Sequence, residues 1–232
     1  MGADKYIFKR KEKKYVLSPD AVAQFLNLAA DYITEDQYPK ETVQSIYLDT
    51  PQNLLIRNSI DAKGYKEKIR LRCYGEVNSD SKVFLELKKK LKGVVYKRRI
   101  SLPLREAEEY IYNHVVHDSS QIMREIDAFM RLYNYPKPKI AISCERLSFI
   151  AKDDKNLRIT IDKNIRYRLN DLSLTHGSGG EPLLDNGKCV MEIKVLSAMP
   201  LWLVKILDEC KIYPQSFSKY GKSHIKELIK GR

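Results

Sequence analysis

The sequence has few cysteines and no long apolar run, and both absences narrow the classes of protein it can belong to. Its four cysteines lie far apart with no CxxC pair, so no zinc site or disulfide framework is indicated. They are typical of reduced, packed thiols in a cytoplasmic protein. No stretch approaches the ~20 apolar residues of a membrane-spanning helix, and residues 1–15 lack the pattern of a signal peptide. We therefore expect a soluble, cytoplasmic chain without a transmembrane segment.

Acidic residues are also scarce relative to basic ones. Against 30 Asp and Glu there are 42 Lys and Arg, which gives the 232-residue chain a formal net charge of +12. Much of this excess lies in residues 63–99, which hold thirteen basic and four acidic residues. An excess of this size indicates an anionic partner, such as nucleic acid, a membrane surface or a phosphorylated small molecule.

Within this segment the charges alternate with apolar residues. In GYKEKIRLRCYG (64–75), cations occupy every second position from Lys66 to Arg72, and Ile69, Leu71 and Cys73 lie between or beside them. This period of two predicts a strand with one cationic and one mostly apolar face. KVFLELKKK, VYKRRI, LRITID and VMEIKVL show related two-faced patterns, whereas the first strand, FKRKEKKY, is charged on both faces.

The order of the predicted elements indicates an α+β fold in a single domain spanning residues 1–232. We expect strands at 6–16, 42–49, 66–74, 82–90, 94–102, 140–147, 157–162 and 190–196, and helices near 18–29, 104–114, 119–134 and 200–212, followed by a short tail. Antiparallel strands interrupted by a few helices are typical of this class. A closed barrel would bury the polar strand faces and leave no sheet edge.

The charged rows have two interpretations. Charges two residues apart on a strand lie about 6.7 Å apart; they repel by only ~0.6 kcal/mol in water but by ~2.5 kcal/mol at an effective dielectric constant of 20. A solvated face tolerates such a row, whereas an enclosed row needs carboxylates or a metal-bound polyanion to compensate it. Glu12, Glu86 and Glu192 are candidate compensating groups.

Two further motifs give little indication of function. His114 and His117 are spaced for metal binding on a helix, but no third ligand is near, so a surface pair is the simpler interpretation. HGSGGEP is not followed by the Lys-Ser/Thr of a phosphate-binding loop and is interpreted as a flexible loop.

An ordered set of segments runs from about residue 8 to residue 222, and consists of RKEKKYVLSP, YLDTP, KIRLRCYG, FLELKKK, VYKRRI, SCERLSF, LRITID, VMEIK and FSKY. In this order the segments resemble the VTC-type polyphosphate polymerase domain of the triphosphate tunnel metalloenzyme (CYTH-like) superfamily. The resemblance implies an eight-stranded antiparallel β-barrel with flanking helices, whose basic lumen binds nucleoside triphosphate, Mn²⁺ or Mg²⁺, and polyphosphate.

The resemblance also assigns roles to individual residues. It implies a catalytic set of Lys14, Arg70, Arg72, Lys88, Lys97, Arg146, Arg158, Glu192 and Lys219. Glu192 matches the family's metal-binding glutamate, and Glu12 and Glu86 are further candidate metal ligands. We also expect substrate contacts from Arg10, Lys68, Lys90, Arg99, Lys194 and Ser218. Arg146 fits the alternation less cleanly, because Glu145 alternates with Ala141, Ser143 and Leu147.

One departure bears on the reaction. Hydrolytic members of the superfamily begin with E-x-E-x-K, and this chain has Arg10-x-Glu12-x-Lys14. Fewer metal-bound carboxylates should weaken the positioning of a hydrolytic water, and an added cation should strengthen the grip on phosphate. We therefore expect transfer of the γ-phosphoryl group of ATP to polyphosphate.

Other functions stay open at this stage. The alternatives are a tunnel triphosphatase or tripolyphosphatase, a non-enzymatic polyphosphate or inositol-phosphate binder, and a protein that binds the nucleic-acid backbone. The expected partners are ATP or another nucleoside triphosphate, pyrophosphate and polyphosphate, without a stable nucleic-acid complex. The sequence gives no prediction of oligomeric state.

Overall fold

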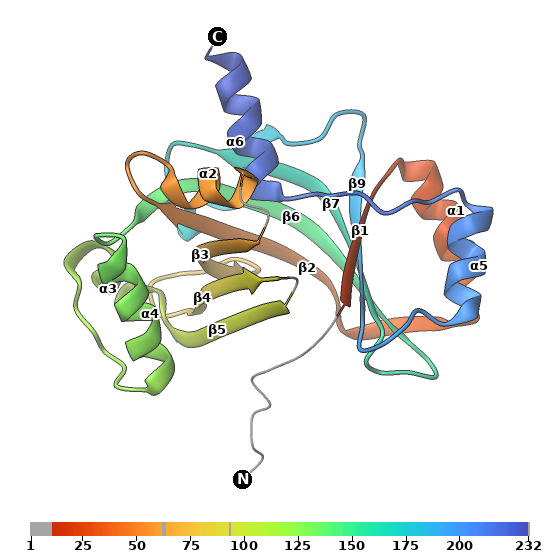
Figure 1. Ribbon diagram of the computed structural model, residues 1–232, viewed down its shortest axis with the longest axis horizontal. Coiled ribbons are helices and arrows are strands. Elements are labelled where there is room, and N and C mark those ends of the chain that lie inside the picture. The colour runs from red at the N-terminus through yellow and green to blue at the C-terminus, as the bar shows by residue number, and fades with distance from the viewer. Residues whose placement is uncertain (1–10, 62–63, 93, 232) are drawn as a thin grey trace.

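The fold is an antiparallel sheet with helices packed against it (Figure 1). The computed structural model describes residues 11–61, 64–92 and 94–231. Its strands are β1 (Lys11–Leu17), β2 (Ile33–Asp49), β3 (Tyr65–Tyr74), β4 (Lys82–Leu91), β5 (Val94–Pro103), β6 (Lys137–Ala151), β7 (Arg158–Arg168), β8 (Glu181–Pro182) and β9 (Cys189–Val195). Its helices are α1 (Pro19–Ala29), α2 (Leu54–Asp61), α3 (Leu104–Asn113), α4 (Gln121–Leu132), α5 (Leu201–Glu209) and α6 (Lys219–Lys230), with a 3₁₀ turn at Leu174–His176. The prediction of an α+β fold is thereby confirmed.

Eight strands follow one another in the order β1-β9-β7-β6-β2-β3-β4-β5, and β8 pairs with β7 outside this path. In the described part of the chain the sheet is not closed by backbone pairing, because β1 and β5 are the two ends of the order, but its curvature is compatible with the expected barrel. The sheet curls so far that side chains of β1 and β4 meet across its hollow. Nζ of Lys88 on β4 lies 3.5 Å from Oε2 of Glu12 on β1. Long charged side chains, rather than a hydrogen-bonded ladder, therefore join the two edge regions.

Two helical layers cover the outer side of this curled sheet. In Figure 1, α3 and α4 flank β3–β5 on the left, and α1 and α5 flank β1 and β9 on the right. On the left, the apolar rows of β3 and β4 belong to one buried core with residues of α3 and α4; Ile69 and Leu85 are fully buried there. On the right, Ile161 and Met191 lie in a second core with Phe25 of α1. The apolar rows expected from the alternation are thus the outward, helix-covered rows.

The opposite rows therefore face inward, across the hollow of the sheet. We call this surface the concave face; it consists of the side chains that alternate with the helix-covered rows on β1–β7 and β9. Its concavity follows from the contact between Glu12 and Lys88, because β1 and β4 are far apart in the strand order and yet touch through side chains of this face.

One end of the concave face is closed by α2 and α6. The buried carboxylate of Asp49 accepts hydrogen bonds from the backbone N–H groups of Leu55 (2.8 Å) and Ile56 (2.9 Å), and from the hydroxyl of Tyr220 on α6 (2.8 Å). The ring of Tyr220 also stacks on that of Tyr47, with centroids 4.8 Å apart. These contacts fix the start of α6 against the sheet.

Helix α6 corrects the sequence-based expectation of a short tail. Ser218 caps it by accepting the N–H of Gly221 at 3.1 Å, which is a typical helix start. Within the described residues, no helix combines the length and apolar character needed to cross a membrane.

Candidate functional site

The concave face gathers its charges into three clusters. The first, the Glu86 cluster, consists of Glu86 on β4 with Arg70 and Arg72 from β3 and Lys97 and Arg99 from β5. These residues meet because the register pairs Glu86 with Arg70 on one side and Arg99 on the other. Arg70 Nη2, Lys97 Nζ and Arg99 Nε each lie 2.7 Å from a carboxylate oxygen, and Arg72 Nε lies 3.9 Å away.

One carboxylate thus faces four cations. The Glu86 side chain is only 1 % exposed, and burial alone would raise its pKa. Arg70 and the three other cations outweigh burial and hold the pKa of Glu86 well below its usual range. The cluster keeps an excess of positive charge that a polyanion can neutralise.

The second cluster, the Glu12–Glu192 cluster, joins the edges of the sheet. Lys14 Nζ lies 3.3 Å from Glu12 and 3.7 Å from Glu192, so two carboxylates converge on one ammonium. Lys194 Nζ lies 2.6 Å from Glu192, and Lys88 contacts Glu12. Burial alone would raise the pKa of Glu192, but Lys194 and Lys14 lower it, so Glu192 is anionic at neutral pH.

The third cluster, the Asp162 cluster, ties α6 to the sheet. Arg146 on β6 makes a bidentate pair with Asp162 on β7, at 2.7 and 2.8 Å. Lys219 at the start of α6 also bonds to Asp162. Burial alone would raise the pKa of Asp162, whereas Lys219 and Arg146 hold it well below its usual range. Asp162 therefore positions two of the sequence-predicted cations.

Lys68 differs from these clustered cations because its partner is neutral. Its Nζ donates to the hydroxyl of Ser218 at 2.7 Å, and no carboxylate lies within 4 Å of it in the described ranges. Burial lowers the pKa of Lys68 to about 8, and Lys14, Lys88 and Lys66 contribute to this shift. An anion bound beside Lys68 would favour its charged form.

The remaining predicted residues lie at the margins of these clusters. Arg158 is exposed and pairs with Asp36 of β2; it lies opposite Lys194 in the β7–β9 ladder. Lys90 is exposed at the end of β4. Arg10 lies outside the described residues. Arg146 lies inward because the β2–β6 register pairs it with Glu41 and places Glu145 on the other face, which resolves the ambiguous alternation.

Several residues of this face were not proposed as site residues from the sequence. Asp162 was visible as a member of the row containing Arg158 and Thr160, but nothing in the row marks it as the partner of Lys219. Tyr47 was not marked by the charge pattern of the sequence, because tyrosine is not counted among the charged residues. In the structure, Arg70 Nη1 donates a hydrogen bond to its hydroxyl at 3.1 Å. Burial raises the pKa of Tyr47, and Arg70, Arg72 and Lys68 lower it more, to about 7.

The carboxylates differ in their suitability for a metal. The described residues contain no group of three or more His, Cys, Asp or Glu side chains arranged to hold an ion. Mg²⁺ is often bound by only one or two carboxylates together with substrate phosphates, and Glu12 with Glu192 fits that pattern. Glu86 fits it poorly, because both of its oxygens are engaged by cations.

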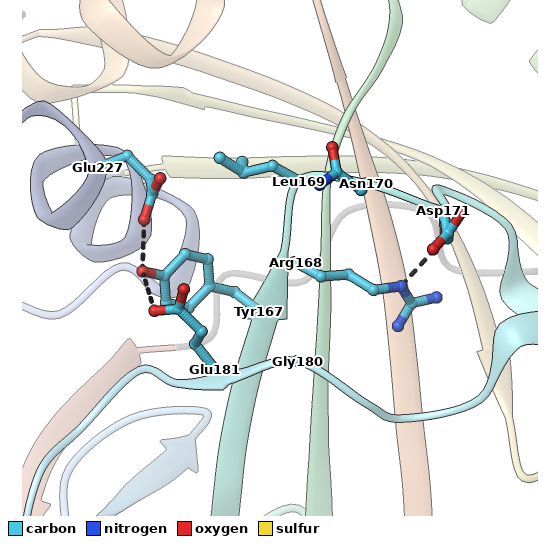
Figure 2. Close-up of a pocket in the computed structure, with 8 residues that line it drawn as sticks. All are labelled: Tyr167, Arg168, Leu169, Asn170, Asp171, Gly180, Glu181 and Glu227. Atoms are coloured by element: carbon cyan, nitrogen blue, oxygen red, sulfur yellow. Dashed lines mark hydrogen bonds between the residues drawn. The ribbon is translucent and has the colours of Figure 1, made fainter. Parts of the chain in front are cut away.

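A separate hollow of about 380 Å³ lies near the end of β7, between the strand β8 and α6 (Figure 2). The Tyr167 hydroxyl donates to Glu227 at 2.6 Å and lies 3.4 Å from Glu181, and these three side chains point toward one another in Figure 2. None of the sequence-predicted site residues lines this hollow.

Comparison with known proteins places the chain in a family. A family model for the VTC domain matches residues 9–226. Two similar relatives are vacuolar transporter chaperone complex subunit 4 of Trypanosoma brucei brucei, 24 % identical over 217 residues, and its namesake in Trypanosoma cruzi, 24 % identical over 218 residues. Each match covers 78 % of this chain and 27 % of the relative, so the chain spans only about a quarter of those proteins.

Solved structures show the same fold. A candidate adenylate cyclase from Bacillus halodurans superposes with a TM-score of 0.57 at 12 % identity, covering 90 % of this chain and 95 % of that one. A candidate adenylate cyclase from Vibrio parahaemolyticus gives a TM-score of 0.51 at 13 % identity, covering 95 % and 99 %. At such identities the likeness concerns the architecture alone.

Proposed function

Because this chain belongs to the VTC domain family, we propose that it is a metal-dependent polyphosphate polymerase acting as one tunnel domain. It transfers the γ-phosphoryl group of ATP, or of another nucleoside triphosphate, to a growing chain of inorganic polyphosphate held on the concave face. Matches to the chaperone-complex subunits support a role in polyphosphate metabolism.

The observation that carries the proposal is the uncompensated positive charge of the concave face. Cations from most of its strands and from α6 converge there and outnumber the carboxylates that contact them. Lys68 is half-buried beside a neutral hydroxyl. Enclosed charge of one sign is unfavourable without a counter-ion, and an extended phosphate chain offers a negative charge on each unit.

Phosphoryl transfer needs positioning and charge neutralisation more than covalent help from the protein. Arg70 and Arg72 present planar guanidinium groups that suit bidentate contacts with phosphate oxygens. Lys68 and Lys219 supply compact point charges at the end closed by α6. Together these groups can hold donor and acceptor phosphates in line and stabilise the charge that develops between them.

Glu12 and Glu192 are the residues that would hold Mn²⁺ or Mg²⁺. When bound, such an ion would neutralise and orient phosphate oxygens. Lys14 keeps the two carboxylates together at 3.3 and 3.7 Å from its Nζ.

The test is to incubate purified protein with ATP and Mn²⁺ and to separate the products on a gel that resolves phosphate chains. We expect a ladder from the wild type and its loss in Lys219→Ala and Glu192→Ala. Lys205→Ala on the exposed side of α5 is the matched control and should keep the ladder.

Two outcomes would contradict the proposal and identify its competitors. Orthophosphate without longer chains indicates a tunnel triphosphatase. Tight polyphosphate binding without turnover at any metal concentration indicates a binding protein.

A further inference from the structure

An aromatic group lies beside the Glu86 cluster on the concave face. It consists of Tyr74, the last residue of β3, and Phe84 near the start of β4, and both contact Arg99 of the cluster. The two rings meet edge to face, with centroids 5.8 Å apart. The Arg99 guanidinium carbon lies 3.9 Å from the centroid of Phe84, and its Nη2 donates to the Tyr74 hydroxyl at 3.0 Å.

Arg99 therefore belongs to two groups at once. Its Nε lies 2.7 Å from Glu86 in the cation cluster, while its guanidinium lies over an aromatic ring. Phe84 and Glu86 are neighbours in the same inward row of β4, about 6.7 Å apart along the strand. Phosphate-binding cations and an aromatic platform are thus adjacent.

This adjacency matches the shape of a nucleoside triphosphate. Unpaired nucleobases are recognised by stacking on aromatic rings and on arginine guanidinium planes. Tyr74, Phe84 and Arg99 are each only partly buried, and the Arg99 side chain is 33 % exposed. Tyr47 on the same face already stacks on Tyr220, so its ring is not a free platform for a base.

We propose that Phe84, Tyr74 and Arg99 form a nucleoside subsite, in which the base of the donor nucleotide stacks while its triphosphate extends over the Glu86 cluster. This inference rests on the proposed function and adds the position and orientation of the donor. Stacking reads no hydrogen-bond pattern on the base, so ATP and GTP should bind with similar affinity.

The test compares two ligands that differ only by the nucleoside. Binding of ATP and of tripolyphosphate is measured by calorimetric titration with metal removed by a chelator, which prevents turnover. Phe84→Leu should weaken ATP binding by about 5-fold to 100-fold, the range expected for loss of one stacked base. It should leave the affinity for tripolyphosphate unchanged. Tyr96→Leu, an aromatic of the same hairpin on the opposite face of the sheet, should change neither affinity.

Equal weakening of both ligands by Phe84→Leu, or no weakening, would overturn the subsite. If Phe84→Leu does not fold, the wild type still decides the question: a bound ethenoadenosine triphosphate should be shielded from acrylamide quenching, and an unshielded fluorophore contradicts the proposal. Failure of the proposed function would give a different result. Binding that prefers ATP over tripolyphosphate, without synthesis of a phosphate ladder, would contradict the polymerase but support the nucleoside subsite.

Discussion

The charge balance around Glu86 can be tested by neutralising that one carboxylate. Glu86→Gln keeps the size of the side chain but leaves Arg70, Arg72, Lys97 and Arg99 without the anion that lies 2.7 Å from three of them. Removing one partner of a buried ion pair costs about 3–5 kcal/mol. The cations are 12 to 46 % exposed, so water relieves part of their repulsion, and we expect a loss near 3 kcal/mol.

In a protein of this length, 1 kcal/mol corresponds to roughly 2–4 °C in the melting temperature. We therefore expect calorimetry in phosphate-free buffer to show a melting temperature lower by about 6–12 °C in Glu86→Gln. Added tripolyphosphate should narrow this difference, because its oxygens take the place of the missing carboxylate among the four cations.

Glu209→Gln provides the control, since Glu209 is exposed on α5 and its neutralisation should leave the melting temperature nearly unchanged. A Glu86→Gln protein as stable as the wild type would refute the role of Glu86 as an internal counter-ion. A loss of stability that tripolyphosphate does not reduce would show that the cluster does not bind polyanions.

Three further predictions concern other parts of the concave face. The pKa of Lys68, lowered by burial to about 8, should rise when phosphate binds, so polyphosphate affinity should be full below pH 8 and fall as the pH rises through 8. Calorimetric titrations between about pH 7 and pH 9 measure this, and Lys68→Arg should flatten the profile. Tyr220→Phe removes a donor to the buried Asp49 and should destabilise the protein by about 1–3 kcal/mol; an unchanged urea midpoint would contradict the anchoring of α6. Glu12→Gln and Glu192→Gln should each raise the Mn²⁺ concentration needed for half-maximal synthesis by about 10-fold or more, whereas an unchanged requirement would place the metal elsewhere.

Most of the sheet could be predicted from alternation, because a strand buried on one side under helices shows its period directly. The rows of β3, β4 and β9 lie as the sequence indicated, with Ile69 and Met191 under helices. Even the conflict at Arg146 concerned only which row of β6 faces inward, and pairing with Glu41 decides this. Such pairing involves residues about a hundred positions apart, which local patterns do not reveal.

The start of α6 was missed for a different reason. Its buried residues are Tyr220, Gly221 and Ser223, whereas its apolar residues Ile225, Leu228 and Ile229 are exposed, so the face that packs on the sheet is not an apolar stripe. Ser218 as the cap and Gly231 at the end were the available signals. The closure of the sheet was predicted from the need to cover strand edges, but that argument does not distinguish backbone pairing from contacts between long side chains such as Lys88 and Glu12.

The candidate site could be predicted in its residue types but not in its groupings. Glu12, Glu86 and Glu192 were all candidate metal ligands from the sequence, and only the geometry separates a carboxylate surrounded by cations from a pair that shares Lys14. Charge alternation shows that cations share a face, whereas the choice of partner depends on side-chain reach across several strands.

The contacts of α6 have a consequence for how the protein folds. Ser218 meets Lys68 across 150 residues, Tyr220 meets Asp49 across 171, and the carbonyl of Phe217 meets Lys14 across 203. Contacts so distant in sequence form slowly, because a long loop must close before they contribute stability. We therefore expect the concave face to be completed in a late folding step that joins segments distant in the sequence, and a molecule in which that step has not occurred to have a sheet without the end wall supplied by α6.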